Sequence, residues 1–178
     1  MTRAPKMNEI EWRQYHQLMR SHPEQYLRIA DDTIRQYPDD PEGYLDCVWA
    51  WMRSERYDNA LADVNTALAL EDCPMTRLDR GMVLRCLGRY REAIEELNRC
   101  EAMAPEVMAG IVEINRAPCH ARLGNLEAAL TDCARLPDDY CLPGLYGAPG
   151  GTKSQVTETV RRLAAEAQRD QGAGGQCP

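Results

Sequence analysis

The sequence predicts an all-α fold built from short helical hairpins that repeat along the chain of 178 residues. A short phrase returns three times, beginning at Tyr57, at Tyr90 and at Leu126. In each copy an aromatic residue or leucine stands three residues before an alanine, a pattern typical of two helices that cross closely. The interval is 33 residues from Tyr57 to Tyr90 and 36 residues from Tyr90 to Leu126. Both intervals suit a repeat of two short helices.

Proline and capping residues mark where these helices begin and end. Ser21 precedes Pro23 and stands three residues before Glu24, which is typical of a helix start. Pro41 and Pro74 repeat the proline placement at later helix starts. We therefore expect helices near residues 8–20, 23–36, 41–54, 57–71, 74–87, 90–103, 107–122 and 125–135.

Two central units share a set of aromatic, glycine, alanine and proline positions. These are Trp51, Tyr57, Ala60 and Ala67 in one unit, and Gly81, Gly88, Tyr90, Ala93 and Pro105 in the next. The pattern resembles the tetratricopeptide repeat (TPR) family. The resemblance implies a TPR-type helical-hairpin array of about three to four repeats over residues 1–136. Its units would be a degenerate one at 8–38, two at 41–73 and 74–107, and a partial one at 108–136, in which Pro118 falls inside the first helix.

Residues 137–153 form a loop rich in proline, glycine and tyrosine. This loop is longer than the roughly 12 to 15 residues of most connections. Several of its side chains are too apolar for a solvated spacer, namely Tyr140, Leu142, Leu145 and Tyr146. We expect the loop to lie against the array, over its last hairpin or across its groove.

A closing helix is expected at 154–170, followed by a disordered tail at 171–178. The helix carries an apolar stripe of Val156, Val160, Leu163, Ala164 and Ala167. Repeat arrays need such a cap to cover their last apolar face.

The segment from Gly147 to Ser154 comes close to a phosphate-binding loop, because a lysine and a serine follow a glycine-rich stretch at a helix start. Thr152, however, stands where the last glycine of that loop should be. The alternative, which we favour, is a glycine-rich turn in which Thr152 and Gln155 form a capping box.

Composition excludes several classes of function. The net charge of −7 argues against nucleic acid as a partner. The longest apolar run, Cys47 to Met52, is too short to span a membrane. No secretory segment is visible, so we expect a cytoplasmic protein.

The cysteines and histidines predict neither a metal site nor a catalytic site. The eight cysteines include no Cys-x-x-Cys pair, so most read as small buried thiols. Cys141 and Cys177, in the loop and the tail, are expected to be the most reactive. His16, His22 and His120 fall in separate helices or caps. We therefore expect a protein that is not an enzyme and has no cofactor.

The resemblance also implies a binding surface, because the first helix of each TPR hairpin lines a concave groove. The expected groove residues are Leu45, Asp46, Trp49, Met52, Leu78, Asp79, Met82, Arg85, Ile114, Asn115 and Arg122. Trp49 lies two residues from Trp51, about 200° around the helix, and is expected to face the groove. The alternative is that Trp49 packs on the first hairpin.

Asp46 and Asp79 stand where TPR relatives that grip a C-terminal carboxylate carry cationic or amide side chains, so that clamp is not expected. A basic or amphipathic segment suits these two carboxylates better, although Arg53, Arg85 and Arg122 weaken a simple charge rule.

These observations predict an adaptor that binds a peptide or helix of a partner protein. One alternative is a small secretion-type chaperone that holds an export client. A distant alternative is a nucleotide-dependent or thiol-redox activity at residues 147–154 or at Cys141. Homodimerisation through the groove, or through the helix that carries Trp12 and Tyr15, also remains open.

Overall fold

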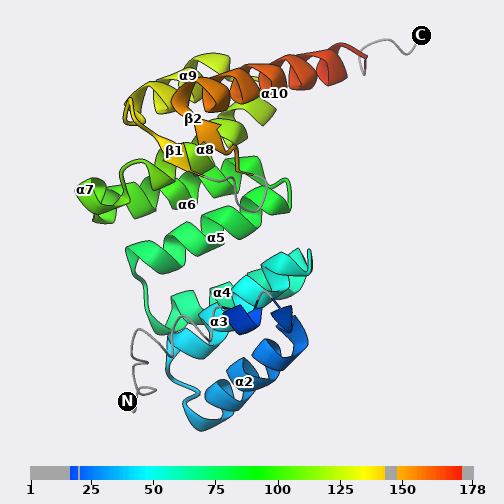
Figure 1. Ribbon diagram of the computed structural model, residues 1–178, viewed down its shortest axis with the longest axis vertical. Coiled ribbons are helices and arrows are strands. Elements are labelled where there is room, and N and C mark those ends of the chain that lie inside the picture. The colour runs from blue at the N-terminus through cyan, green and yellow to red at the C-terminus, as the bar shows by residue number, and fades with distance from the viewer. Residues whose placement is uncertain (1–16, 20, 143–147, 174–178) are drawn as a thin grey trace.

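The computed structural model describes residues 17–19, 21–142 and 148–173 (Figure 1). Its helices are α2 (Pro23–Gln36), α3 (Pro41–Arg53), α4 (Tyr57–Leu70), α5 (Pro74–Cys86), α6 (Tyr90–Met103), α7 (Pro105–Met108), α8 (Ile111–Arg122), α9 (Leu126–Arg135) and α10 (Lys153–Ala173). Two short strands, β1 (Cys141–Leu142) and β2 (Gly151–Thr152), pair antiparallel before α10. The expected helix at 8–20 lies mostly outside the described residues, as do Trp12, Tyr15 and Cys177.

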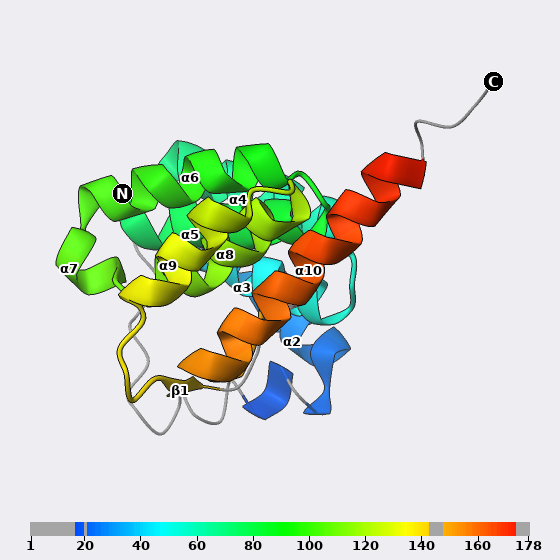
Figure 2. The same ribbon diagram turned by 90° about the horizontal axis from the view of Figure 1, so that it is seen from above.

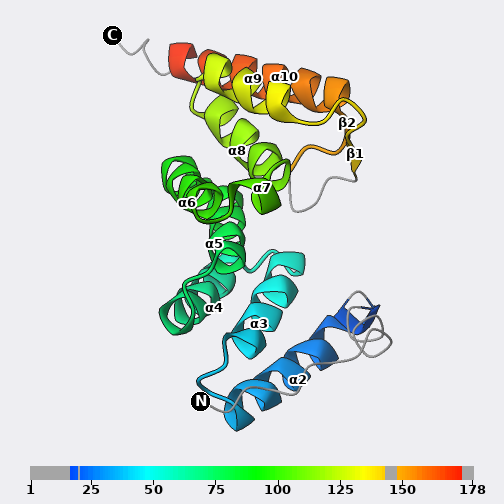
Figure 3. The same cartoon turned by 90° about the vertical axis from the view of Figure 1, so that its left-hand side faces the viewer.

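The helices pack in consecutive pairs, which confirms an all-α helical-hairpin array. Contacts join α2 to α3, α3 to α4, α4 to α5 and α5 to α6, and the order continues with α8 against α9. The hairpins stack along the long axis of the molecule (Figure 1), and in the view of Figure 3 α4 and α6 lie on one side while α3 and α8 lie on the other. No helix in the described part of the chain is both long and apolar enough to cross a membrane.

The repeated alanines explain why the two helices of a hairpin approach closely. Ala60, Ala93 and Ala129 are each the fourth residue of their helix, and all three are fully buried. On the facing helix, a Cβ added at Gly81 would lie 2.9 Å from Cγ of Leu97. A larger residue at these positions would therefore push the helices apart.

The third unit differs from the expected continuous helix at 107–122. The chain instead forms the single turn of α7 and then starts α8 after Gly110, whose φ of 83° suits glycine. The carboxylate of Glu113 accepts a hydrogen bond from the Gly110 N–H at 2.6 Å, which caps the new start. Pro118 is buried within α8, and the helix continues past it to Arg122.

The C-terminal helix caps the array, as the apolar stripe predicts. Val156, Val160 and Ala164 are almost fully buried in one cluster with residues of α8 and α9, and Tyr140 packs against the same cluster. Figure 2 shows α10 at this end of the stack. The described part of the 137–153 loop thus lies on the last hairpin. Leu145 and Tyr146 fall outside the described residues.

Two details of this region were not predicted from the sequence. The strand pair β1–β2 closes the loop, with Cys141 opposite Thr152. In addition, α10 runs to Ala173, so residues 171–173, expected in the disordered tail, are helical, while residues 174–178 lie outside the described part.

Candidate functional site: the face of the first helices

Six of the eleven expected groove residues are apolar, and they pack into the array. Met52, Leu78, Met82 and Ile114 are buried in two core clusters, and Leu45 and Trp49 are half-buried against one of them. These side chains stabilise the stack of hairpins and do not form the open apolar floor that the sequence suggests.

Trp49 agrees with the alternative given from the sequence, in which it packs on the first hairpin. It packs against the first hairpin, in a cluster with Met19, Tyr26 and Ala50. The apolar side chains of Met19 and Tyr26 cover part of the indole, which is why it is half-buried.

Two polar members of the set are engaged within the chain. Asp46 accepts a hydrogen bond at 2.7 Å from the hydroxyl of Tyr26 on α2. Arg122 is exposed, and its Nη1 donates to Glu166 of α10 at 3.2 Å. Neither group needs a partner protein to be satisfied.

The remaining three residues, Asp79 and Arg85 on α5 and Asn115 on α8, are buried without full hydrogen bonding. Their exposed fractions are 4%, 6% and 3%. Oδ1 of Asp79, Nε and Nη2 of Arg85, and Oδ1 of Asn115 have no hydrogen-bond partner in the described part of the chain. No other buried side-chain nitrogen or oxygen there lacks one. We use the name first-helix face for helices α3, α5 and α8, the first helices of their hairpins, with the expected groove residues that they carry.

The repeat explains why Asp79 is unsatisfied whereas Asp46 is not. Both aspartates are the sixth residue of their helix. Tyr26, which bonds to Asp46, is the fourth residue of α2, and the fourth residue of α4 is Ala60. Alanine has no hydroxyl to donate. Burial, with a smaller contribution from Glu42, accordingly raises the pKa of Asp79 to about 7.

Arg85 and Asn115 lie on helices that contact each other, α5 and α8. Burial raises the pKa of Cys119 to about 12, and the Arg85 guanidinium is close enough to oppose that rise. Cys119 lies one turn after Asn115 and bonds to its backbone oxygen at 3.2 Å. The Asn115 amide donates through Nδ2 to Ile111 O at 2.8 Å, which leaves its carbonyl oxygen as a fixed acceptor.

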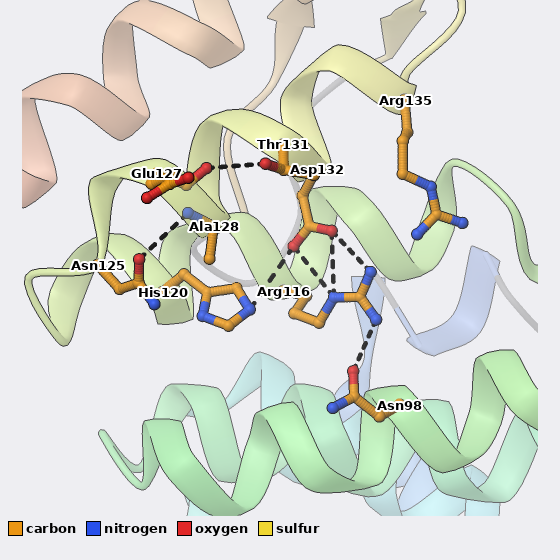
Figure 4. Close-up of a pocket in the computed structure, with 9 residues that line it drawn as sticks. All are labelled: Asn98, Arg116, His120, Asn125, Glu127, Ala128, Thr131, Asp132 and Arg135. Atoms are coloured by element: carbon orange, nitrogen blue, oxygen red, sulfur yellow. Dashed lines mark hydrogen bonds and ion pairs between the residues drawn. The ribbon is translucent and has the colours of Figure 1, made fainter.

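A second polar cluster surrounds a cavity of about 410 Å³ near α6, α8 and α9 (Figure 4). Arg116 is at its centre and is as buried as Arg85. Its Nε and Nη2 bind the carboxylate of Asp132, at 3.0 Å to Oδ2 and 2.6 Å to Oδ1. Its Nη1 binds Asn98 at 2.7 Å and Glu101 at 2.6 Å.

This second cluster ties helices together and leaves its arginine little capacity to bind an anion. His120 lies 4.0 Å from Asp132, and its pKa is lowered by burial, against the effect of the Asp132 carboxylate. Sequence reasoning missed the cluster, because Arg116 and Asp132 meet only through the register of α8 against α9. The sequence signal for it is weak: Arg116 stands beside the small residue Ala117, and Asp132 stands beside Cys133.

Comparison with known proteins gives no basis for transferring a function. The chain matches no protein-family model, no curated protein and no solved structure. What this protein binds has to follow from the contacts of its own residues.

The loop before α10 forms the expected capping box. The N–H of Thr152 donates to Oε1 of Gln155 at 2.8 Å, and the N–H of Gln155 donates to Oγ1 of Thr152 at 3.4 Å. Lys153 binds Ala134 O at 3.0 Å and Asp138 at 2.9 Å. The amide and the ammonium that a phosphate would use are therefore already bonded within the chain. Gly147 lies outside the described residues.

The cysteines of the described part are all free thiols. Cys47, Cys100, Cys119 and Cys133 are buried, and burial raises the pKa of each; Cys141 is exposed. Within the same residues, no group of three or more histidine, cysteine or acidic side chains could hold a metal ion.

Proposed function

We propose that this protein is a non-enzymatic adaptor of the TPR type, which binds a segment of a partner protein along the first-helix face. The observation that carries this proposal is the set of buried unpaired atoms on Asp79, Arg85 and Asn115. A buried polar group without a hydrogen bond costs about 1–3 kcal/mol. A partner whose binding exposes these buried atoms, and which supplies the missing donors and acceptors, would recover this free energy.

The arrangement of these atoms favours a chain segment over a small molecule. They come from two successive hairpins, in helices that occupy equivalent places in the repeat. An extended segment presents amides, carbonyls and side chains at regular intervals, so it can meet several such sites along its length. A helical array also provides an extended surface for this mode of binding.

Charge and cysteine chemistry fit the same proposal. A net charge of −7 suits a protein partner better than a nucleic acid. Thiols that are free throughout the described residues favour a reducing compartment such as the cytoplasm.

Affinity capture tests the proposal with a pair of matched variants. Wild type, Arg85→Gln and Asn115→Ala are used to capture proteins from a lysate of the source organism, and bound proteins are quantified by mass spectrometry. The control is Arg91→Gln, because Arg91 is an exposed arginine on α6. We expect one set of partners to be retained by the control and lost by both face variants, with all variants equally helical by circular dichroism. Partners that bind all four proteins equally would place recognition elsewhere.

A self-association test covers a second copy as the partner. Light scattering would then report a wild-type dimer and an Arg85→Gln monomer, with the control still dimeric.

A further inference from the structure

The cavity of about 410 Å³ near α6, α8 and α9 is large enough for a small organic molecule or for a side chain of a partner. We infer that it binds an organic cation, an ammonium or guanidinium group whose N–H donors bond to the Glu127 carboxylate and to a ring nitrogen of His120. None of the expected groove residues lines this cavity, so the site is separate from the one in the proposed function.

His120 is an accessible polar group of the cavity that lacks a hydrogen bond. Its Nε2 lies 4.0 Å from Oδ2 of Asp132, which is beyond hydrogen-bond distance, and 19% of its side-chain surface is exposed. The buried side-chain atoms without partners in the described part of the chain are on Asp79, Arg85 and Asn115. The ring nitrogens of His120, which also lack a partner there, are therefore open to a ligand.

The protonation state of His120 makes it an acceptor for a cation. Burial lowers the pKa of the imidazole, against the opposing effect of the Asp132 carboxylate. The ring is therefore neutral at neutral pH, and a neutral imidazole has one nitrogen that accepts a hydrogen bond. In Figure 4 the ring lies beside Arg116, and Asn98 approaches the same guanidinium from α6.

Glu127 supplies a negative charge at the same cavity. It is an exposed residue in the first turn of α9. Its backbone oxygen accepts a hydrogen bond from Oγ1 of Thr131 at 3.0 Å, but its carboxylate has no partner among the described residues. Both carboxylate oxygens are thus free to accept N–H donors from a ligand.

The charges around the cavity disfavour an anion and favour a cation. The two arginines of the cavity, Arg116 and Arg135, are already paired with three shielded carboxylates, those of Glu101, Glu113 and Asp132. With Glu127, four carboxylates surround two guanidinium groups, which leaves an excess of two negative charges. An organic cation suits this arrangement better than a metal ion, because the described residues contain no group of three or more histidine, cysteine or acidic side chains that could hold one.

Two amide groups of the cavity can bind an acceptor beside the cation. Oδ1 of Asn98 accepts from Nη1 of Arg116 at 2.7 Å, and Oδ1 of Asn125 accepts from the N–H of Ala128 at 3.1 Å. The Nδ2 of each is unbonded within the described residues. A lysine or arginine side chain followed by its own backbone carbonyl offers the matching pair of groups.

Calorimetric titration of the full chain tests the inference. The probes are N-acetyl-arginine amide and N-acetyl-lysine amide, which represent side chains of a protein, and spermidine, which represents a free amine. The matched control ligand is N-acetyl-citrulline amide, which resembles the arginine compound but has no charge. We expect binding of the cations, with the citrulline compound at least about tenfold weaker than the arginine compound. Tighter binding of the capped amino acids would assign the cation to a protein side chain, and tighter binding of spermidine would assign it to a small amine.

Three variants test the residues of the site. Glu127→Gln should weaken the cations about threefold or more, because it removes one charge at the cavity. The control is Glu158→Gln, at an exposed glutamate of α10 that does not line the cavity, and it should bind as wild type does. Asn98→Asp adds a carboxylate and keeps an acceptor for Arg116, so it should tighten binding by about the same factor. A variant that fails to fold could not produce this gain.

The imidazole resonances show where the cation binds. The chain has three histidines, so the ¹H–¹⁵N signals of His120 are assigned by their loss in His120→Gln. The arginine compound should shift these signals, and the citrulline compound should not.

Several results would overturn the site. These are the absence of binding by every cation, equal binding of the citrulline and arginine compounds, and unshifted His120 signals. Equal effects of Glu127→Gln and Glu158→Gln would also do so, because they would indicate a general attraction to a chain with a net charge of −7. None of these results bears on the adaptor proposal, which is tested by capture with variants of Arg85 and Asn115.

Discussion

Arg116 and Arg85 are buried to the same extent, at 6% exposure each, yet their surroundings are opposite. Arg116 spends its donors on Asp132, Asn98 and Glu101, which joins α6, α8 and α9. Arg85, a residue of α5, has two nitrogens unpaired among the described residues. Burial alone therefore does not reveal what a charged residue does. The partners do, and they separate a residue that joins helices from one whose donors the described residues leave unpaired.

The sharpest test of this comparison removes the paired arginine. Arg116→Met should lower the free energy of unfolding by about 3–5 kcal/mol, because the buried Asp132 would keep its charge without its cation. Urea unfolding followed by circular dichroism measures the change. Arg91→Met, at an exposed site, should stay within about 0.5 kcal/mol of wild type. A loss below about 1 kcal/mol for Arg116→Met would mean that the network contributes little to the fold.

The unpaired Asp79 should make the free energy of unfolding depend on pH. In the unfolded chain Asp79 ionises near its ordinary pKa, but in the folded protein burial and then Glu42 raise that pKa to about 7. The folded state thus holds the proton between these values, and stability is lost as pH rises toward 7. Between pH 5 and pH 8 the loss from this group should be about 3 kcal/mol.

Asp79→Asn isolates this contribution, because asparagine has the same shape and does not titrate. Urea unfolding at pH 5 and at pH 8 should show a smaller fall for Asp79→Asn than for wild type. Asp139→Asn, at an exposed position, serves as the control. Parallel pH profiles for wild type and Asp79→Asn would show that the Asp79 carboxylate is satisfied in solution.

Removing the unpaired arginine should change the free energy of unfolding in the opposite direction to removing the paired one. Arg85→Met keeps the length of the side chain and deletes a buried charge that has no counter-charge in the described residues. We expect the free energy of unfolding to rise by about 1–3 kcal/mol. Thermal unfolding scans of wild type, Arg85→Met and Arg116→Met, run together, measure both changes in stability. A fall in stability for Arg85→Met would assign the guanidinium a structural partner and remove the contrast.

The sequence predicts the helical hairpins better than it predicts the buried polar residues that lack partners. Helix ends at Pro23, Pro41 and Pro74 and the capping box at Thr152 follow from local chemistry, so a single stretch of sequence is enough to find them. The break at Gly110 was missed, because a glycine in a helical pattern is compatible with both a continuous helix and a stop.

The site depends on contacts between distant segments, and here the sequence is less informative. Periodicity places Asp79, Arg85 and Asn115 on the first helices, but it cannot show which polar groups find partners. Asp46 illustrates the difficulty, because its partner, Tyr26, stands 20 residues earlier. Likewise, Trp49 was expected in the groove because its rotation from Trp51 is known from the sequence, whereas the surface of the first hairpin that covers it is not.

The smallest expected effect on stability concerns the two equivalent aspartates, Asp46 and Asp79, which differ in their hydrogen-bond partners. Tyr26→Phe removes the hydroxyl that bonds to Asp46 and leaves the buried ring in place, so the first junction should lose about 1 kcal/mol of stability. Tyr44→Phe is the matched control, because its hydroxyl makes only an exposed contact with Pro38 O at 3.4 Å and should change stability by less. Both are measured by urea unfolding at constant pH. If Tyr26→Phe were as neutral as Tyr44→Phe, the tyrosine would not be what distinguishes Asp46 from Asp79. The alanine at the equivalent position of α4 would then no longer account for the unpaired oxygen on the first-helix face.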